Sequence, residues 1–228
     1  MSQGSGHGMD ERIENARLCY ERAVFEGDAG ALAEADRDLD AVEADLALAR
    51  GRIIHTRFLH QRDVGPGQAS EDPGELALFE RAAVLYRALG DVAGEAEAQF
   101  WVGCFYQVVR RDNDTAAPAL DRSLELAAQA GEKVTMSEAL RHLGIAAHVA
   151  GQPDLARERL EESTRLRREL GQAAGVAANL IGLAYIAAGQ GRRDDALAIL
   201  AEAGDLAAAS GARRILRAVE EAQAAIGG

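Results

Sequence analysis

Residues 132–171 read EKVTMSEALRHLGIAAHVAGQPDLARERLEESTRLRRELG. This pattern of small and branched apolar residues returns almost unchanged forty residues later and, more loosely, forty residues earlier. A fixed period of this length is typical of stacked supersecondary units, each of which buries its apolar face only against its neighbours. The sequence therefore predicts a solenoid of repeats.

The repeat keeps its register over three segments that end at Gly131, Gly171 and Gly211. The positions shared at a spacing of 40 are Ala116, Ala156 and Ala196, then Leu120, Leu160 and Leu200, then Leu126, Leu166 and Leu206. Further upstream, Gly90 precedes Gly131 by 41 residues and Gly51 precedes Gly90 by 39, and Phe79 and Leu85 keep the spacing of 41. We interpret these five glycines as successive repeat boundaries.

Within each unit, apolar residues recur at spacings of three and four, which indicates two helices and not a strand. Glycine ends the second helix, where a left-handed residue is favoured, and a short polar residue begins the next. The start signals are Asp154 after Pro153, the pair Thr135 and Glu138 as a capping box, and Asp72 before Pro73 with Glu75 at the third helical position. Each repeat is thus predicted to be a helical hairpin.

Two stretches resemble the tetratricopeptide repeat family, in a version with units near 40 residues. They are LRHLGIAAHVAGQPDLARERLEESTRL from Leu140 and NLIGLAYIAAGQGRRDDALAILAEAGDL from Asn179. Gly144 and Ala184 hold the small position where paired helices approach, and Cys104 is expected to hold it one repeat earlier. The resemblance is strongest over residues 91–211. It implies an all-α, right-handed α-α superhelix of about five hairpins plus a C-terminal capping helix, whose first helices line a concave groove.

One repeat domain is expected over residues 10–228, after a disordered polar tail at residues 1–9. A loop at Gly65, Pro66 and Gly67 is expected to interrupt its first half. Expected helices cover residues 10–26, 29–50, 52–64, 73–89, 92–110, 115–130, 134–150, 154–170, 173–188, 193–210 and 212–225. Gly51 is read as dividing the second helix from the third, although a helix can continue through a glycine at a cost of about 1 kcal/mol.

The chain is acidic, with a formal net charge of -12 and 25 basic residues, of which only Lys133 is a lysine. An acidic chain lacks long-range attraction to phosphate backbones, and no polybasic patch for a membrane is present, so we expect neither nucleic-acid nor membrane partners. Cys19 and Cys104 lie far apart and indicate a reduced, cytoplasmic setting. No phosphate-binding glycine loop or zinc motif occurs, so no cofactor and no metal are expected.

The family resemblance places the groove on the first helix of each hairpin. Read by register, the candidate ligand-binding residues are Trp101, Phe105, Glu138, Arg141, His148 and Tyr185, with Arg57 and His60 as contributions from the second hairpin. Trp101 and Phe105 are as readily explained by packing between repeats, since aromatic residues at helical spacing are commonly core. Arg141 and His148 favour an exposed position, because burial without a partner is costly.

These residues predict a non-catalytic binding protein, an adaptor or sensor that recognises a peptide or protein segment or a small ligand. Arginine offers a fork to a carboxylate and the aromatic rings offer apolar contact. Two alternatives remain open: an accessory enzyme that uses groove histidine and arginine residues as acid and base, and a homo-oligomeric scaffold that assembles through outer or terminal helices.

Overall fold

The structure is a computed structural model that describes residues 10–65 and 69–228, and within these ranges the chain is helical without strands. The predicted tail at residues 1–9 and the loop positions Pro66 and Gly67 lie outside the described residues. The chain divides into two compact units, one ending at Ala98 and the other running from Gln99 to Gly228. The boundary falls inside helix α4, Val92–Val108.

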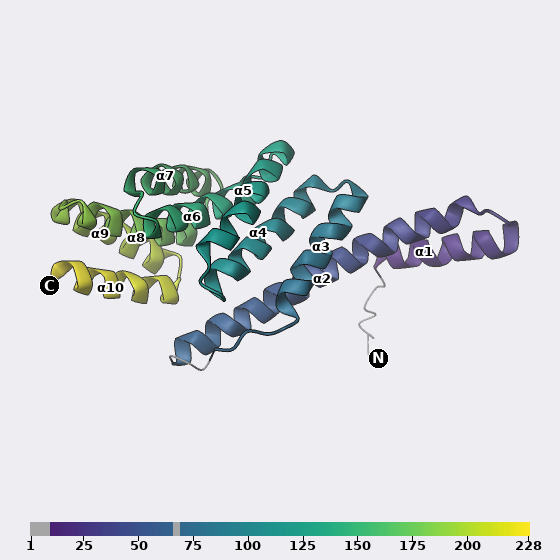
Figure 1. The fold of residues 1–228 in the computed structure, drawn as a ribbon, viewed down its shortest axis with the longest axis horizontal. Helices are drawn as coiled ribbons and strands as arrows, with labels where there is room; N and C mark the ends of the chain where they lie inside the picture. The colour runs from purple at the N-terminus through teal and green to yellow at the C-terminus, as the bar shows by residue number, and fades with distance from the viewer. Residues whose placement is uncertain (1–9, 66–68) are drawn as a thin grey trace, which may run out of the picture. The chain divides into compact units, whose positions relative to one another are not determined.

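The first unit consists of α1 (Glu11–Glu21), a five-residue π-helical turn (Arg22–Glu26), α2 (Gly30–Val64) and α3 (Glu75–Leu89). Gly27 ends the first helical segment with a φ of 75°. Small residues of α1 and α2 form their shared core, namely Ala16, Cys19, Ala31 and Ala35. α1 packs on the N-terminal part of α2, and α3 packs on α2 as well (Figure 1).

The expected boundary at Gly51 is wrong, because α2 continues through it as one helix of 35 residues. Gly51 is buried, and a Cβ atom added to it would lie 2.5 Å from the ring of Phe79 on α3. The glycine therefore serves close helix packing and not termination. One consequence is that α2 is the packing partner of both α1 and α3, where two separate hairpins were expected.

The second unit contains the regular repeats. After α4 come α5 (Asn113–Ala130), α6 (Lys133–Val149), α7 (Pro153–Glu169), α8 (Ala173–Gly189), α9 (Arg193–Ala209) and α10 (Arg213–Gly227). Left-handed glycines follow the helix ends at positions 131, 151, 171, 191 and 211. α6 with α7 and α8 with α9 form the predicted hairpins, each packed against the next (Figure 1).

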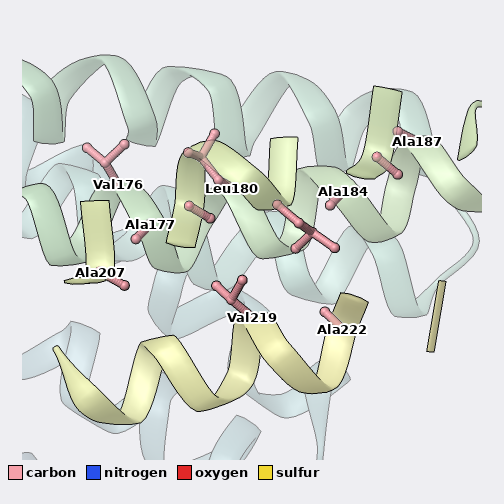
Figure 2. Packing of buried hydrophobic residues seen from close by; sticks show 11 residues of the cluster. Val176, Ala177, Leu180, Ala184, Ala187, Ala207, Val219 and Ala222 are labelled. Atoms are coloured by element: carbon pink, nitrogen blue, oxygen red, sulfur yellow. The ribbon is translucent and has the colours of Figure 1, made fainter. Parts of the chain in front are cut away.

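The C-terminal helix closes the core of the second unit. Val219 and Ala222 of α10 point toward α8, whose Ala177, Leu180 and Ala184 belong to the same buried cluster (Figure 2). α10 packs against both α8 and α9, and its buried residues belong to the same apolar cluster as theirs.

The register of α4 differs by one residue from the prediction. Gly103, and not Cys104, is the equivalent of Gly144: a Cβ atom on Gly103 would lie 2.6 Å from Cγ of Leu120, and one on Gly144 would lie 3.0 Å from Cγ of Leu160. The connection between α4 and α5, residues 109–112, is one residue longer than the connection at residues 150–152. Arg111 adopts a φ of 57° there, at the place where Gly151 stands one repeat later.

Two predicted helix starts also differ. α6 begins at Lys133, so Thr135 is already inside the helix and buried, and no capping box forms with Glu138. α3 begins at Glu75. Asp72 still serves this start, because its Oδ1 accepts the backbone N–H of Gly74 at 2.8 Å.

Candidate functional site

The expected inner face of the fourth and fifth hairpins corresponds to one side of α6 and one side of α8. The predicted inner positions of α6 (Glu138, Arg141, Ile145 and His148) and of α8 (Ala178, Ile181 and Tyr185) are all half-buried or exposed. Neighbouring positions on both helices, such as Ala139, Leu140, Ala177 and Leu180, are buried. The predicted inner positions are therefore more accessible than these buried positions.

An ion pair joins α6 to α7 at the edge of this face. The Nη2 atom of Arg167 lies 2.6 Å from Oε2 of Glu138. The Arg167 side chain is only 3% exposed, and its Nη1 donates to the carbonyl oxygen of Gly175 at 2.9 Å. Gly175 makes room for it, since a Cβ atom there would lie 3.0 Å from Arg167 Cδ. Burial lowers the pKa of Arg167, and Glu138 acts in the opposite direction.

Arg141 is the second guanidinium of this face, and it contacts neutral acceptors only. Its Nη1 donates to the carbonyl oxygen of Ala178 at 3.2 Å and to Oδ1 of Asn179 at 3.4 Å, both on α8. Burial and then the positive charge of Arg167 lower the pKa of Arg141 to about 10. It remains charged at neutral pH, in an environment that disfavours the charge.

A buried chain of polar groups continues from Arg141 into the layer beneath. The side-chain amide of Asn179 donates to the hydroxyl of Ser163 at 2.8 Å, and that hydroxyl donates to the carbonyl oxygen of Ser137 at 2.6 Å. Asn179 and Ser163 are fully buried. The chain fixes α6, α7 and α8 to one another and holds the acceptors of Arg141 in place.

The charges of this cluster do not balance. It holds two guanidinium groups, Arg141 and Arg167, and one carboxylate, Glu138, which lies against Arg167. Within the described residues, no carboxylate lies at ion-pair distance from Arg141. The face thus carries a local excess of one positive charge in a chain whose net charge is -12.

His148 and Tyr185 lie further along the same two helices, and both are exposed. Arg141 contacts Ala178, which follows it by 37 residues. The same offset places His148 at the level of Tyr185. Ile145 and Ile181, both half-buried, lie between these residues and Arg141 on their helices. The face therefore combines one cationic group with an apolar and aromatic surface.

The remaining candidates lie elsewhere. Phe105 is fully buried, with the guanidinium of Arg110 4.9 Å from its ring centroid, so its expected place on an open groove is wrong. Trp101 is half-buried and packs edge-on against Phe100 at 5.2 Å. Arg57 and His60 are exposed on α2 and belong to the first unit.

Sequence reasoning missed Arg167 and Asn179, although the register contained a signal for both. Arg167 occupies the position of Ala127 and Ala207 in the neighbouring repeats, and both alanines are fully buried. Likewise, Asn179 stands where the adjacent repeats have Ala139 and Val219. A polar residue at a core position of one repeat indicates a buried interaction, because an unpaired polar group there would be costly.

A second buried pair lies in the first unit. Nδ1 of His55 on α2 lies 2.7 Å from Oε1 of Glu75 on α3, and both side chains are buried. Oε2 of Glu75 has no hydrogen-bond partner within the described chain. The buried histidine of α2 is therefore His55, which pairs with Glu75, whereas the predicted ligand-binding residue His60 is exposed.

The outer side of the second unit has a shallow hollow of about 320 Å³ between α7 and α8. Its lining residues are Glu161, Thr164, Arg165, Arg168, Glu169, Leu180 and Leu183. The arginines are already engaged, Arg165 with Glu162 and Glu169, and Arg168 with Glu202 at 2.8 Å. This balanced surface offers less to a charged ligand than the face around Arg141.

Comparisons with protein families and with curated proteins do not narrow the function of this chain. No protein-family model matches it, and no curated protein is similar to it. Residues 10–65 and 69–228 contain no cluster of three or more histidine, cysteine, aspartate or glutamate residues that could hold a metal ion. Over the same ranges, no helix has the length and apolar character required to span a membrane.

Proposed function

We propose that this chain is a tetratricopeptide-like protein with a right-handed superhelix, and that the face of α6 and α8 binds a partner that bears a carboxylate. In this role it acts as a non-catalytic adaptor or sensor. The period of 40 residues, the left-handed glycines between helices and the close approach of paired helices at Gly103 and Gly144 support the family assignment.

One observation carries the binding proposal: Arg141 is a partly buried cation without a carboxylate partner in the described chain. A guanidinium and a carboxylate form two parallel charge-assisted hydrogen bonds, which are stronger than bonds to neutral acceptors. A bound carboxylate would balance the charge that burial and Arg167 disfavour. Ligand binding would therefore relieve an electrostatic cost built into the free protein.

The surface beside Arg141 supports an extended peptide over a compact anion. Ile145 and Ile181 offer apolar contact, and the ring of Tyr185 is exposed further along α8. A peptide that combines an acidic group with an aromatic or aliphatic residue matches this arrangement. Because the whole chain is acidic, nonspecific attraction of such a peptide to other surfaces is weak.

Isothermal titration calorimetry with short peptides that combine aspartate or a free C-terminal carboxylate with an aromatic residue tests this proposal. The matched variants are Arg141→Gln and Arg165→Gln, the latter at an exposed arginine on α7. We expect Arg141→Gln to weaken binding at least about tenfold, which corresponds to about 1.4 kcal/mol, and Arg165→Gln to leave it unchanged.

Two further arms identify the ligand class. An amidated peptide lacking every carboxylate should fail to bind, and succinate reports whether a small dicarboxylate is sufficient without apolar contacts. Equal losses in the two arginine variants, or no binding of any carboxylate peptide to the unmodified chain, would refute the proposal.

A further inference from the structure

α2 carries an exposed row of large aliphatic side chains at a spacing of seven residues. The row consists of Leu32, Leu39, Leu46 and Ile53, each between 46% and 55% exposed. Seven residues are close to two helical turns, so the four side chains follow one side of the helix. The buried residues of α2, such as Ala31, Ala44 and Leu48, lie on other sides, toward α1 and α3.

A second row of charged residues accompanies the first. Each aliphatic residue is followed four positions later by a charge, in the order Asp36, Glu43, Arg50 and Arg57. All four are exposed, and the two acidic residues precede the two basic residues. The row thus changes sign near the middle of α2, close to Leu46.

The hairpin of α1 and α2 leaves the aliphatic row uncovered. Polar contacts join α1 and the π-helical turn that follows it to one edge of α2, from Arg12 to Asp45 at 2.6 Å and from Arg22 to Glu34 at 3.2 Å. These pairs show that α1 and α2 are antiparallel, and helical geometry then places the aliphatic row of α2 along the opposite edge. Ile13 and Tyr20 of α1, seven residues apart and also exposed, extend the same edge.

We propose that two copies of this chain associate through α2 in an antiparallel arrangement about a twofold axis near Leu46. In this arrangement Asp36 faces Arg57 of the second copy, and Glu43 faces Arg50 of the second copy. Leu39 packs near Ile53 of the second copy, and the two Leu46 side chains meet at the axis. A parallel arrangement would bring like charges together at both ends, which costs free energy.

The length and periodicity of the row fit a helix pair better than a small ligand. Aliphatic residues repeating every seven positions form the seam of paired helices. From Leu32 to Arg57 the row extends over roughly 40 Å at a rise of about 1.5 Å per residue. An exposed apolar strip of this kind is unusual on a monomer and marks an interaction surface.

The charges of the row are largely available for this contact. Asp36, Arg50 and Arg57 form no ion pair or side-chain hydrogen bond within the described chain. Glu43 accepts both Nε and Nη2 of Arg81 on α3, at 2.7 and 2.9 Å, in an exposed pair. Such surface pairs contribute at most about 1 kcal/mol, so Arg50 of the second copy can join this pair without a large loss.

Light scattering coupled to size-exclusion chromatography, over a series of concentrations of the full chain, measures the association. We expect a dimer that dissociates on dilution, and a monomer for the double variant Leu39→Asp with Leu46→Asp. The matched control is Leu18→Asp on α1, a leucine 45% exposed that helical geometry places on another side of α1 than Ile13 and Tyr20; it should remain dimeric. Circular dichroism confirms that each variant is folded.

Charge variants and engineered cysteines test the orientation. Arg50→Glu should weaken the dimer by roughly tenfold or more, and adding Glu43→Arg to it should restore association. Leu46→Cys should form a disulfide with the same position of the second copy, because position 46 lies at the twofold axis. Leu32→Cys should not crosslink, because position 32 lies far from its equivalent in the second copy. The native Cys19 and Cys104 are buried and should not compete for this disulfide. A monomer at every concentration, a dimer unaffected by Leu39→Asp with Leu46→Asp, or efficient crosslinking through Leu32→Cys would each overturn the proposal.

Discussion

Glycine performs two opposite tasks in this chain, as a comparison of the repeat boundaries in the second unit with Gly51 in the first unit shows. In the second unit, glycines at positions 131, 151, 171, 191 and 211 stand in left-handed conformations, with no atom within 4 Å of the position that a Cβ atom would occupy. In the first unit, Gly51 lies in the middle of a helix with the Phe79 ring directly against it. The spacing of glycines alone does not distinguish a glycine that ends a helix from one that permits close helix packing. The two kinds differ in whether a buried side chain, such as Phe79, lies against the glycine.

The largest expected effect follows from this contrast. Gly51→Ala should lower the free energy of unfolding by up to about 2 kcal/mol, because overpacking costs about 1–3 kcal/mol and the gain in helix propensity offsets only about 1 kcal/mol of this. Phe79 is fully buried, so its ring has little room. Urea unfolding followed by circular dichroism measures the change.

Gly189→Ala is the matched control, since Gly189 is helical and has no atom within 4 Å of the added methyl position. It should be neutral or slightly stabilising. Gly51→Ala should cost less stability when it is introduced into the Phe79→Leu variant than when it is introduced into the unmodified chain, because the smaller side chain leaves room for the added methyl group. If Gly51→Ala unfolds at the same urea concentration as the unmodified chain, the close contact between α2 and α3 is incorrect.

The next effect separates stability from binding inside the second unit. Glu138→Gln should destabilise the chain by about 1–2 kcal/mol, because it leaves the buried guanidinium of Arg167 without its carboxylate. This is less than for a fully buried pair, since the Glu138 side chain is 35% exposed. Arg141→Gln should change stability by less than about 0.5 kcal/mol, because its bonds are long and go to neutral acceptors.

Thermal unfolding of the two variants, measured side by side, checks this order. If Arg141 binds the ligand and Glu138 has a structural role, Arg141→Gln should lose less stability than Glu138→Gln but more peptide binding. A greater loss of stability in Arg141→Gln than in Glu138→Gln would make Arg141 a structural residue.

The sequence predicted the helices of the second unit closely, because equivalent residues in successive repeats can be aligned at a spacing of 40. Helix ends from Val92 to Ala209 lie within two residues of the predicted bounds. The shift at Cys104 arose from the longer connection before α5, where Arg111 replaces the usual glycine. No period marks such an insertion, since it changes a loop and not the apolar pattern.

The first unit offered no second copy of itself for comparison. Continuity of α2 through Gly51 depends on the contact with Phe79, which is 28 positions away in the sequence. The pair of His55 and Glu75 depends likewise on how α3 packs against α2. Periodicity describes which side of a helix is apolar, but such contacts are set by the tertiary arrangement of two helices.

The smallest expected effect concerns the start of α5, beside the irregular connection. Oδ1 of Asp112 accepts the backbone N–H of Thr115 at 3.0 Å, and Oδ2 accepts its hydroxyl at 2.6 Å, whereas α7 and α9 begin without a side-chain cap. The hydrogen bond from the Thr115 hydroxyl, followed by that from its backbone N–H, lowers the pKa of Asp112 below its ordinary value of 3.8. The ionised carboxylate therefore stabilises the folded state above pH 3.8, and this contribution is lost as the pH falls through the lower pKa of the folded state.

Asp112→Asn should accordingly be less stable than the unmodified chain at neutral pH. The difference should shrink as the pH falls below 3.8, the ordinary pKa of an aspartate carboxyl group. Thr115→Val removes the hydroxyl donor while keeping the backbone N–H, so it should reduce the pH dependence without abolishing it. Urea unfolding at a series of acidic and neutral pH values measures both. An equal stability difference between Asp112→Asn and the unmodified chain at every pH would show that the charge of Asp112 plays no part in the cap.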